Sequence, residues 1–395
     1  MLMPVLSLVL AIVVLLVVAR RSLWVALMAA ALIVGVFNLP LPELGRLALH
    51  TIADPGIIYL GLIVAIIPIM GGILQQSGML SGMVDNLSMR RDMFLVTGPA
   101  FLGMLPIPGG ALLSAPLVLR AGDDISTADY AAINVWFRHL LTFIYPLASL
   151  LICTQIAGLN PFVAMLYLSP WLVLLLALGW VFLLRGIRGK LVRAANARRR
   201  DLVIPVFIIL AAPGLHVLLQ YILPGLHERI TLLIGVSFGM VLSMYFARTD
   251  FRSFGKVVVN MKPWIFFLLI VMIFFFLHVF SASPLPDLIA SIELPHSFML
   301  VVVSAAVGLV TARVSAAMSL MLPILAAKFG ALDYTSFSIL YFSIFMGYVI
   351  SPLHPCVLVT LEFFGCGMRK FYRRIIMPGI ISLAIAYATA LLLGN

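Results

Sequence analysis

Apolar segments long enough to cross a lipid bilayer recur along almost the whole chain of 395 residues. A helix rises about 1.5 Å per residue and the hydrocarbon core is about 30 Å thick, so one crossing needs about 20 apolar residues. Hydrophobic residues make up 64% of the chain, against roughly 45–50% in soluble domains. The sequence therefore predicts an all-α polytopic membrane protein. Ten segments are expected to cross: residues 1–19, 22–40, 55–78, 129–158, 161–184, 202–223, 228–246, 258–281, 335–365 and 375–393.

Two further apolar stretches, residues 93–121 and 297–329, do not fit a single crossing. At roughly 45–50 Å each is too long for one upright helix. Each is also interrupted near its middle, by PIPGG at residues 106–110 and by TARVS at residues 311–315. We expect both to be re-entrant helical hairpins, which enter and leave the membrane on the same side.

The distribution of positive charge supports the hairpin interpretation. Lysine and arginine are enriched in cytoplasmic loops, and two re-entrant hairpins place 20 of the 25 such residues on one side. If residues 93–121 crossed, the basic segment 185–201 would move outside. This topology predicts a plasma (inner) membrane protein with both termini outside. The first segment has no preceding basic region, and Arg20 and Arg21 follow it, so a retained helix is expected in place of a cleaved signal peptide.

The two halves of the chain are expected to be inverted repeats. The first comprises residues 1–184, with the hairpin at 93–121 and a broken helix at 129–158; the second comprises residues 202–395, with the hairpin at 297–329 and a broken helix at 335–365. A basic cytoplasmic linker, residues 185–201, joins them. Five crossings per half make the second copy upside down relative to the first, a pattern found in transporters. Offsets of 205 or 209 residues align Gly103 with Gly308, Ser114 with Ser319, Thr142 with Ser351, and Pro146 with Pro355.

Polar residues at these breaks predict a binding site near the middle of the membrane. Irregular backbone is tolerated there only inside protein or beside a cavity, and helices that restart at such a break expose the positive ends of their dipoles. Ser351 is expected to cap the restarting helix, with Pro352 as its first residue. The candidate substrate-binding residues are Pro108, Gly109, Gly110, Ser114, Arg138, Thr142, Thr311, Arg313, Ser315, Ser319, Ser351 and His354.

Arg313 adds a full positive charge in an apolar setting, where charge is costly and needs a partner. Together with Arg138 it leaves a positive surplus that a carboxylate or phosphate can neutralise. The alternative is that Arg313 hydrogen-bonds backbone carbonyls at the hairpin tip and Arg138 extends toward the cytoplasm. His354 and Glu362 are candidates for carrying a coupling proton, and sodium is the other possible coupling ion.

The sequence carries no enzyme motif such as HExxH, GxSxG or a P-loop, so we expect no enzyme. Its three cysteines, Cys153, Cys356 and Cys366, lie in or beside apolar segments without zinc-site spacing. No cofactor or metal centre is therefore predicted. The net charge of +11 is best explained by membrane topology, so nucleic acid is not expected as a partner.

The motifs GMLPIPGGALLSAP, FRHLLTFIYP, GLVTARVSAAMS and GYVISPLHPCVLVT, arranged in two inverted halves, resemble the ion transporter superfamily. This group includes divalent-anion/sodium symporters, gluconate permeases and citrate carriers. The chain looks most similar to a functionally uncharacterised prokaryotic membrane family within it. The resemblance implies a homodimer whose mobile domain moves as an elevator past a scaffold. The paired Ser-Asn-Thr tips of the symporters are replaced by PIPGG and TARVS, so their sodium sites and dicarboxylate specificity do not carry over.

The function expected from these observations is secondary active transport of a small organic anion, coupled to sodium or protons. Its partners would be the anion, the lipid bilayer and a second copy of the chain. Two alternatives remain open at this point. An anion channel would use the same helix dipoles, and a membrane-embedded enzyme would act on a lipid-linked substrate.

Overall fold

The computed structural model describes residues 2–18, 21–80, 82, 90–104, 110–122, 124–147, 149–189, 199–291 and 293–393. Within these residues the chain is helical and contains no strand, which confirms the all-α prediction. Each of the ten segments expected to cross contains helix. By length and composition, six of the described helices can span a membrane, and one bent pair makes a seventh.

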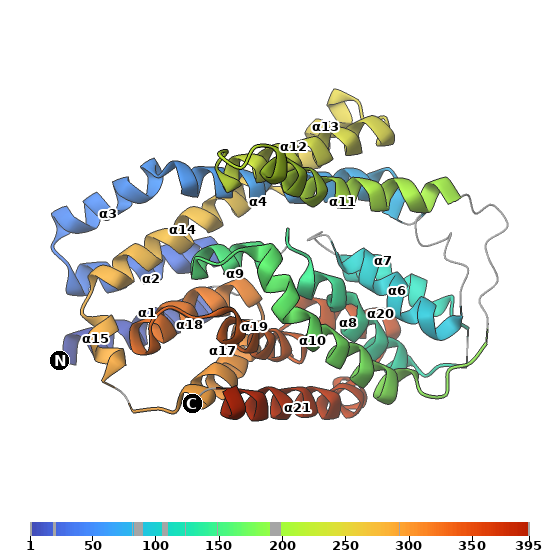
Figure 1. Cartoon of the computed structure of the whole chain (residues 1–395). Coiled ribbons are helices and arrows are strands. Elements are labelled where there is room, and N and C mark those ends of the chain that lie inside the picture. The colour runs from blue at the N-terminus through green and yellow to red at the C-terminus, as the bar shows by residue number, and fades with distance from the viewer. Residues whose placement is uncertain are drawn as a thin grey trace.

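A first helix group packs around α4 and α14 and occupies the upper and left parts of Figure 1. Most of these helices are apolar on most faces, and they enclose a core that includes Leu27, Ile63 and Phe276. The group consists of α1 (Leu2–Val18), α2 (Leu23–Asn38), α3 (Leu41–Ala53), α4 (Pro55–Gln76), α11 (Arg199–Ile222), α12 (Glu228–Ala247), α13 (Phe251–Met261), α14 (Pro263–Ala282) and α15 (Leu285–Ala290).

A second helix group surrounds a core in which Phe143 of one helix meets Tyr341 and Phe342 of another. In Figure 1 it fills the lower and right parts of the molecule. The group consists of α6 (Arg91–Gly103), α7 (Gly110–Leu119), α8 (Thr127–Ile144), α9 (Ser149–Ala157), α10 (Pro161–Gly179), η1 (Trp180–Leu184), α16 (His296–Phe298), η2 (Met299–Val303), α17 (Ser304–Thr311), α18 (Val314–Phe329), α19 (Tyr334–Val349), α20 (Pro355–Phe364) and α21 (Met368–Leu393).

The stretches expected to be interrupted are interrupted in the structure. In the first half α6 and α7 pack side by side, and α8 and α9 meet at a bend of 44°. In the second half α17 ends at Thr311, Ala312 adopts a left-handed conformation with φ 50°, and α18 begins at Val314. Helices α19 and α20 are separated by residues 350–354. All of these helix ends fall within the second group.

Glycines allow very close packing between the helices that carry these breaks. A methyl group at Gly103 on α6 would overlap the backbone carbonyl of Arg138 on α8. Likewise, a methyl group at Gly308 on α17 would overlap the carbonyl of Ile344 on α19. Backbones in direct contact leave little room for relative sliding, so each arm is fixed against its broken helix.

Candidate functional site

A cavity of about 220 Å³ lies where the two helix groups meet. Its two walls differ in chemistry. The first helix group contributes only apolar side chains, from α2, α4 and α14: Leu23, Val64, Ile67, Phe266 and Leu269. Every polar lining residue described comes from the second group: Thr142, Ser149, Arg313, Ser315, Tyr341 and Tyr348. The second group also contributes the apolar residues Leu147, Ile152, Val314 and Phe345.

Arg313 is the only charged residue among the described residues that line the cavity. It sits at the N-cap position of α18 with extended backbone (φ −151°, ψ 121°), which directs the chain out of the turn at Ala312. Its guanidinium forms no hydrogen bond or ion pair with any residue that the structure describes. A free guanidinium facing a cavity is suited to bind a carboxylate or phosphate through two parallel hydrogen bonds.

The N-terminus of α18 adds to this positive field. The first amide groups of a helix have no partner within it, and the helix dipole places partial positive charge there. Ser315 lies in this first turn and lines the cavity. Thr311 supports the turn from the other side, since its hydroxyl donates to the carbonyl oxygen of Val307 at 2.8 Å. Thr311 itself does not line the cavity.

The break between α8 and α9 supplies two hydroxyls. Thr142 lines the cavity and donates its proton to the carbonyl oxygen of Gly103, so its oxygen remains available only as an acceptor. Ser149, the first residue of α9, also lines the cavity. Ser149 was not among the predicted residues, although its place three residues after Pro146 marks it as the start of the second half-helix.

Three aromatic residues of α19 form one side of the cavity: Tyr341, Phe345 and Tyr348. Their spacing of four and three residues places them on one face of the helix. Tyr341 is fully buried, and its hydroxyl has no hydrogen-bond partner among the described residues. The hydroxyl of Tyr348 lies 3.3 Å from Nε2 of His139. Sequence reasoning missed this stripe because aromatic residues at helical spacing are usual in any helix core.

Several predicted residues are engaged elsewhere. Arg138 is buried and donates to the hydroxyl of Ser114 at 3.3 Å. Ser319 donates to the carbonyl of Ala316 within its own helix at 2.9 Å. None of these three predicted residues lines the cavity.

The expected capping role of Ser351 is wrong. The helix after the break begins at Pro355, with His354 at its N-cap position. The hydroxyl of Ser351 instead donates to the carbonyl oxygen of Leu309 at 2.5 Å and accepts the amide of Leu353 at 3.1 Å. Leu309 lies in the last turn of α17, where carbonyl oxygens lack a partner within the helix. The Ser351 hydroxyl bonds to this carbonyl and therefore does not cap the helix that follows it in sequence.

None of the remaining predicted residues is among the described residues that line the cavity. Pro108 and Gly109 lie outside the described residues, and Gly110 begins α7. Glu362 is exposed on α20 and does not line the cavity. His354 is buried, and its ring centroid lies 4.0 Å from that of the cavity residue Tyr348. Neither ring nitrogen of His354 has a well-aligned hydrogen-bond partner among the described residues.

The only grouping of metal-ligand types found among the described residues adjoins this histidine. His139, His354 and Cys356 bring their ligand atoms within 4.8 Å of one another. Imidazole and thiolate are the ligands that zinc and copper prefer. The sequence did not reveal the grouping because His139 comes from α8 and the other two from the second break, so no local spacing marks it.

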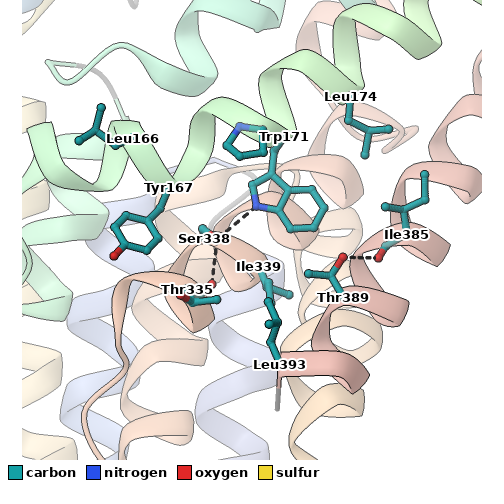
Figure 2. A pocket seen from close by; sticks show the side chains of 11 residues that line it. Leu166, Tyr167, Trp171, Leu174, Thr335, Ser338, Ile339, Ile385, Thr389 and Leu393 are labelled. Atoms are coloured by element: carbon teal, nitrogen blue, oxygen red, sulfur yellow. Dashed lines mark hydrogen bonds between the residues drawn. The ribbon is translucent and has the colours of Figure 1, made fainter.

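A larger depression, of about 490 Å³, lies on the outer face of α10, α19 and α21. Figure 2 shows Trp171 reaching across it toward Ser338, to which its Nε1 donates at 3.2 Å. The described residues that line this groove include no charged side chain. An anion would find no counter-charge there, so the smaller cavity at Arg313 is the better candidate for a polar ligand.

Comparison with known proteins identifies the family of the chain. A family model described as a protein of unknown function (DUF401) matches residues 2–393. No curated protein matches the sequence.

Proposed function

Because the chain belongs to the DUF401 family of proteins of unknown function, we propose a function from the site itself: secondary active transport of a small organic anion. The observation that carries this proposal is the free guanidinium of Arg313 in a cavity between two helix groups. Arg313 is exposed, so its guanidinium is open to a bound anion, which would accept charge-assisted hydrogen bonds from it. The amides at the start of α18 and the hydroxyl of Ser315 provide further hydrogen bonds.

An inverted repeat is part of the proposal. The contacts of the two halves correspond: Thr142 donates to the end of α6, and Ser351 donates to the last turn of α17. In Figure 1, α6 and α7 lie toward the right of the molecule, whereas α17 and α18 lie toward the left. Two hairpins entering from opposite ends would support ten crossings with two re-entrant segments, as in the ion transporter superfamily.

Elevator-type alternating access would move the second helix group, which carries every described polar residue of the site, past the first. One feature supports this assignment: the wall that the first group presents to the cavity is apolar and uncharged. An apolar wall makes no directional contact with the ligand, so the ligand can leave it without breaking hydrogen bonds. Under this proposal the protein is a homodimer in the plasma membrane with both termini outside.

Sodium or protons would couple transport to a gradient. His354 and His139 are titratable side chains that adjoin the cavity through Tyr348, and backbone carbonyls at the breaks are suitable sodium ligands. Glu362 is exposed on α20, so it would carry a coupling proton only if it faces an aqueous path.

Uptake into proteoliposomes tests the proposal. Purified protein is reconstituted, and a panel of labelled organic anions is offered under a sodium gradient, a pH gradient or neither. Saturable uptake that depends on one gradient is expected, and Arg313→Gln should reduce it at least tenfold because a charge-assisted hydrogen bond is lost. Arg252→Gln, which changes an exposed arginine of α13, is the matched control and should retain uptake.

Other results would redirect the assignment. Steady anion current without saturable, gradient-dependent uptake would indicate a channel. Chemical conversion of a lipid-linked compound in detergent, without any gradient, would indicate an enzyme. Equal uptake by Arg313→Gln and the parent protein would contradict the role given to this arginine.

A further inference from the structure

We infer that the ligand of this cavity is a monocarboxylate with a short apolar body, and not a dicarboxylate, a tricarboxylate or a sugar acid. The inference rests on the proposed transport of an organic anion and adds the chemical class of that anion. It follows from the two unlike walls of the cavity and from its size.

The charge of the site sets the charge of the ligand. Arg313 is the only charged side chain among the described lining residues. One guanidinium binds one carboxylate through two parallel hydrogen bonds. A second carboxylate on the same ligand would find no counter-charge among these residues.

The wall formed by the first helix group determines the chemistry of the part of the ligand beyond the carboxylate. Every described residue that α2, α4 and α14 contribute to the cavity is aliphatic or phenylalanine. Hydroxyl groups of a sugar acid would be buried against this wall without partners, which is unfavourable. Methylene and methyl groups would be removed from water there, which is favourable by about 0.8 kcal/mol each, or about fourfold in affinity.

The volume limits the length of the apolar body. A water-sized group occupies about 30 Å³, so a cavity of about 220 Å³ holds about seven such groups. This corresponds to a carboxylate carrying a chain of about four or five carbon atoms.

Calorimetric titration of the purified full-length protein with unbranched monocarboxylates, from acetate to octanoate, tests the inference. Affinity should rise about fourfold per methylene and stop rising near pentanoate or hexanoate. Succinate and glutarate should bind at least tenfold more weakly than butyrate and pentanoate. Dicarboxylates that bind as tightly as monocarboxylates of equal length, and lose binding in Arg313→Gln, would overturn the inference and leave the proposed transport intact. If no organic anion of either class binds, both fail.

Two variants separate the ends of the ligand. Arg313→Gln should weaken every monocarboxylate by at least tenfold without changing the dependence on chain length, because it removes the counter-charge and leaves the apolar wall intact. Val64→Thr, a nearly isosteric change in the apolar wall, should weaken the longer acids more than acetate. Val236→Thr, a buried change on α12 away from the cavity, is the matched control. A chain-length dependence unchanged by Val64→Thr would contradict the assigned apolar end.

Discussion

The hydroxyl of Ser351 lies 2.5 Å from the carbonyl oxygen of Leu309 and ties the break between α19 and α20 to the end of α17. This contact joins the two irregular segments of the second half. Because Leu309 and Ser351 are far apart in sequence, the bond can form only after the two helices have packed together. It therefore stabilises the folded state and not the isolated helices.

Replacing this hydroxyl should destabilise the protein. Ser351 is fully buried, and Ser351→Ala leaves the carbonyl of Leu309 without its donor, which we expect to cost about 1–3 kcal/mol. Thermal unfolding in detergent, followed by intrinsic fluorescence, measures the change. Ser169→Ala on the exposed face of α10 removes a hydroxyl bonded only within its own helix and should shift the midpoint little. Equal shifts for both variants would show that the contact contributes no special stability.

The close packing of α17 on α19 gives a second prediction. Gly308→Ala places a methyl group on the carbonyl of Ile344 and should cost about 1–3 kcal/mol, because backbone atoms cannot rotate away as a side chain does. Gly214 lies inside α11 with no atom near its added methyl group. Gly214→Ala should therefore be neutral or stabilising, since alanine favours helix more than glycine. A neutral Gly308→Ala would mean that α17 and α19 can separate at no cost.

Local signals in the sequence account for the helices and for the places where they stop. Prolines and hydroxyls at Thr142, Pro146 and Ser351 indicated interrupted helices, and the structure interrupts both segments. The charge of Arg313 in an apolar setting pointed to the cavity that it lines. These features depend on neighbouring residues, which a single sequence displays directly.

The partners across the site could not be predicted in this way. Leu23 and Phe266 are ordinary apolar residues in helices that are apolar on most faces, so no periodicity marks the side that faces a cavity. Arg138 was expected to add free charge, but Ser114 packs against it. The cap expected at Ser351 failed for a related reason, since a carbonyl distant in sequence became its partner. Each case was decided by tertiary packing.

An ion pair at the surface predicts a dependence of stability on pH. Arg91 on α6 pairs with Asp124, just before α8, and also donates to the carbonyl of Arg188 at 3.0 Å. The hydrogen bond from Arg91 lowers the pKa of Asp124 below its usual 3.8. A lowered carboxylate pKa contributes stability above the unfolded value, and this is lost as the pH falls through the folded value.

Asp124→Asn should therefore lower the unfolding midpoint slightly at pH 7, and the difference from the parent protein should shrink as the pH falls below 3.8 toward the lowered pKa of the folded state. The effect is small because Asp124 is exposed to solvent. Fluorescence-detected unfolding at a series of pH values measures it. A difference of the same size at pH 3 and pH 7 would assign the loss to something other than the ion pair.

Cysteine labelling tests the re-entrant arrangement. Arg90 and Thr127 are exposed positions on either side of residues 93–121. A hairpin that does not cross puts both on one face, so Arg90→Cys and Thr127→Cys should react with an impermeant thiol reagent from the same side. Gly225→Cys, between α11 and α12, should react from the other side. Labelling of Arg90→Cys and Thr127→Cys from opposite faces would mean that residues 93–121 span the membrane.

The proposed movement of one helix group past the other can be tested by joining them. Gln155 of α9 accepts a hydrogen bond from Arg229 of α12 at 3.1 Å, so these positions face each other across the two groups. Cross-linking Gln155→Cys with Arg229→Cys by a short bifunctional thiol reagent should abolish uptake and leave anion binding within about threefold. Asp129→Cys with Arg374→Cys, which joins α8 to α21 inside the second group, is the matched control and should leave uptake intact. If the cross-linked protein transports at the uncross-linked rate, the two groups do not move relative to each other at this end. A rigid scaffold with a local gate would then replace the elevator. If the control pair also blocks uptake, movement within the second group is required, and the division of the chain into two rigid bodies is wrong.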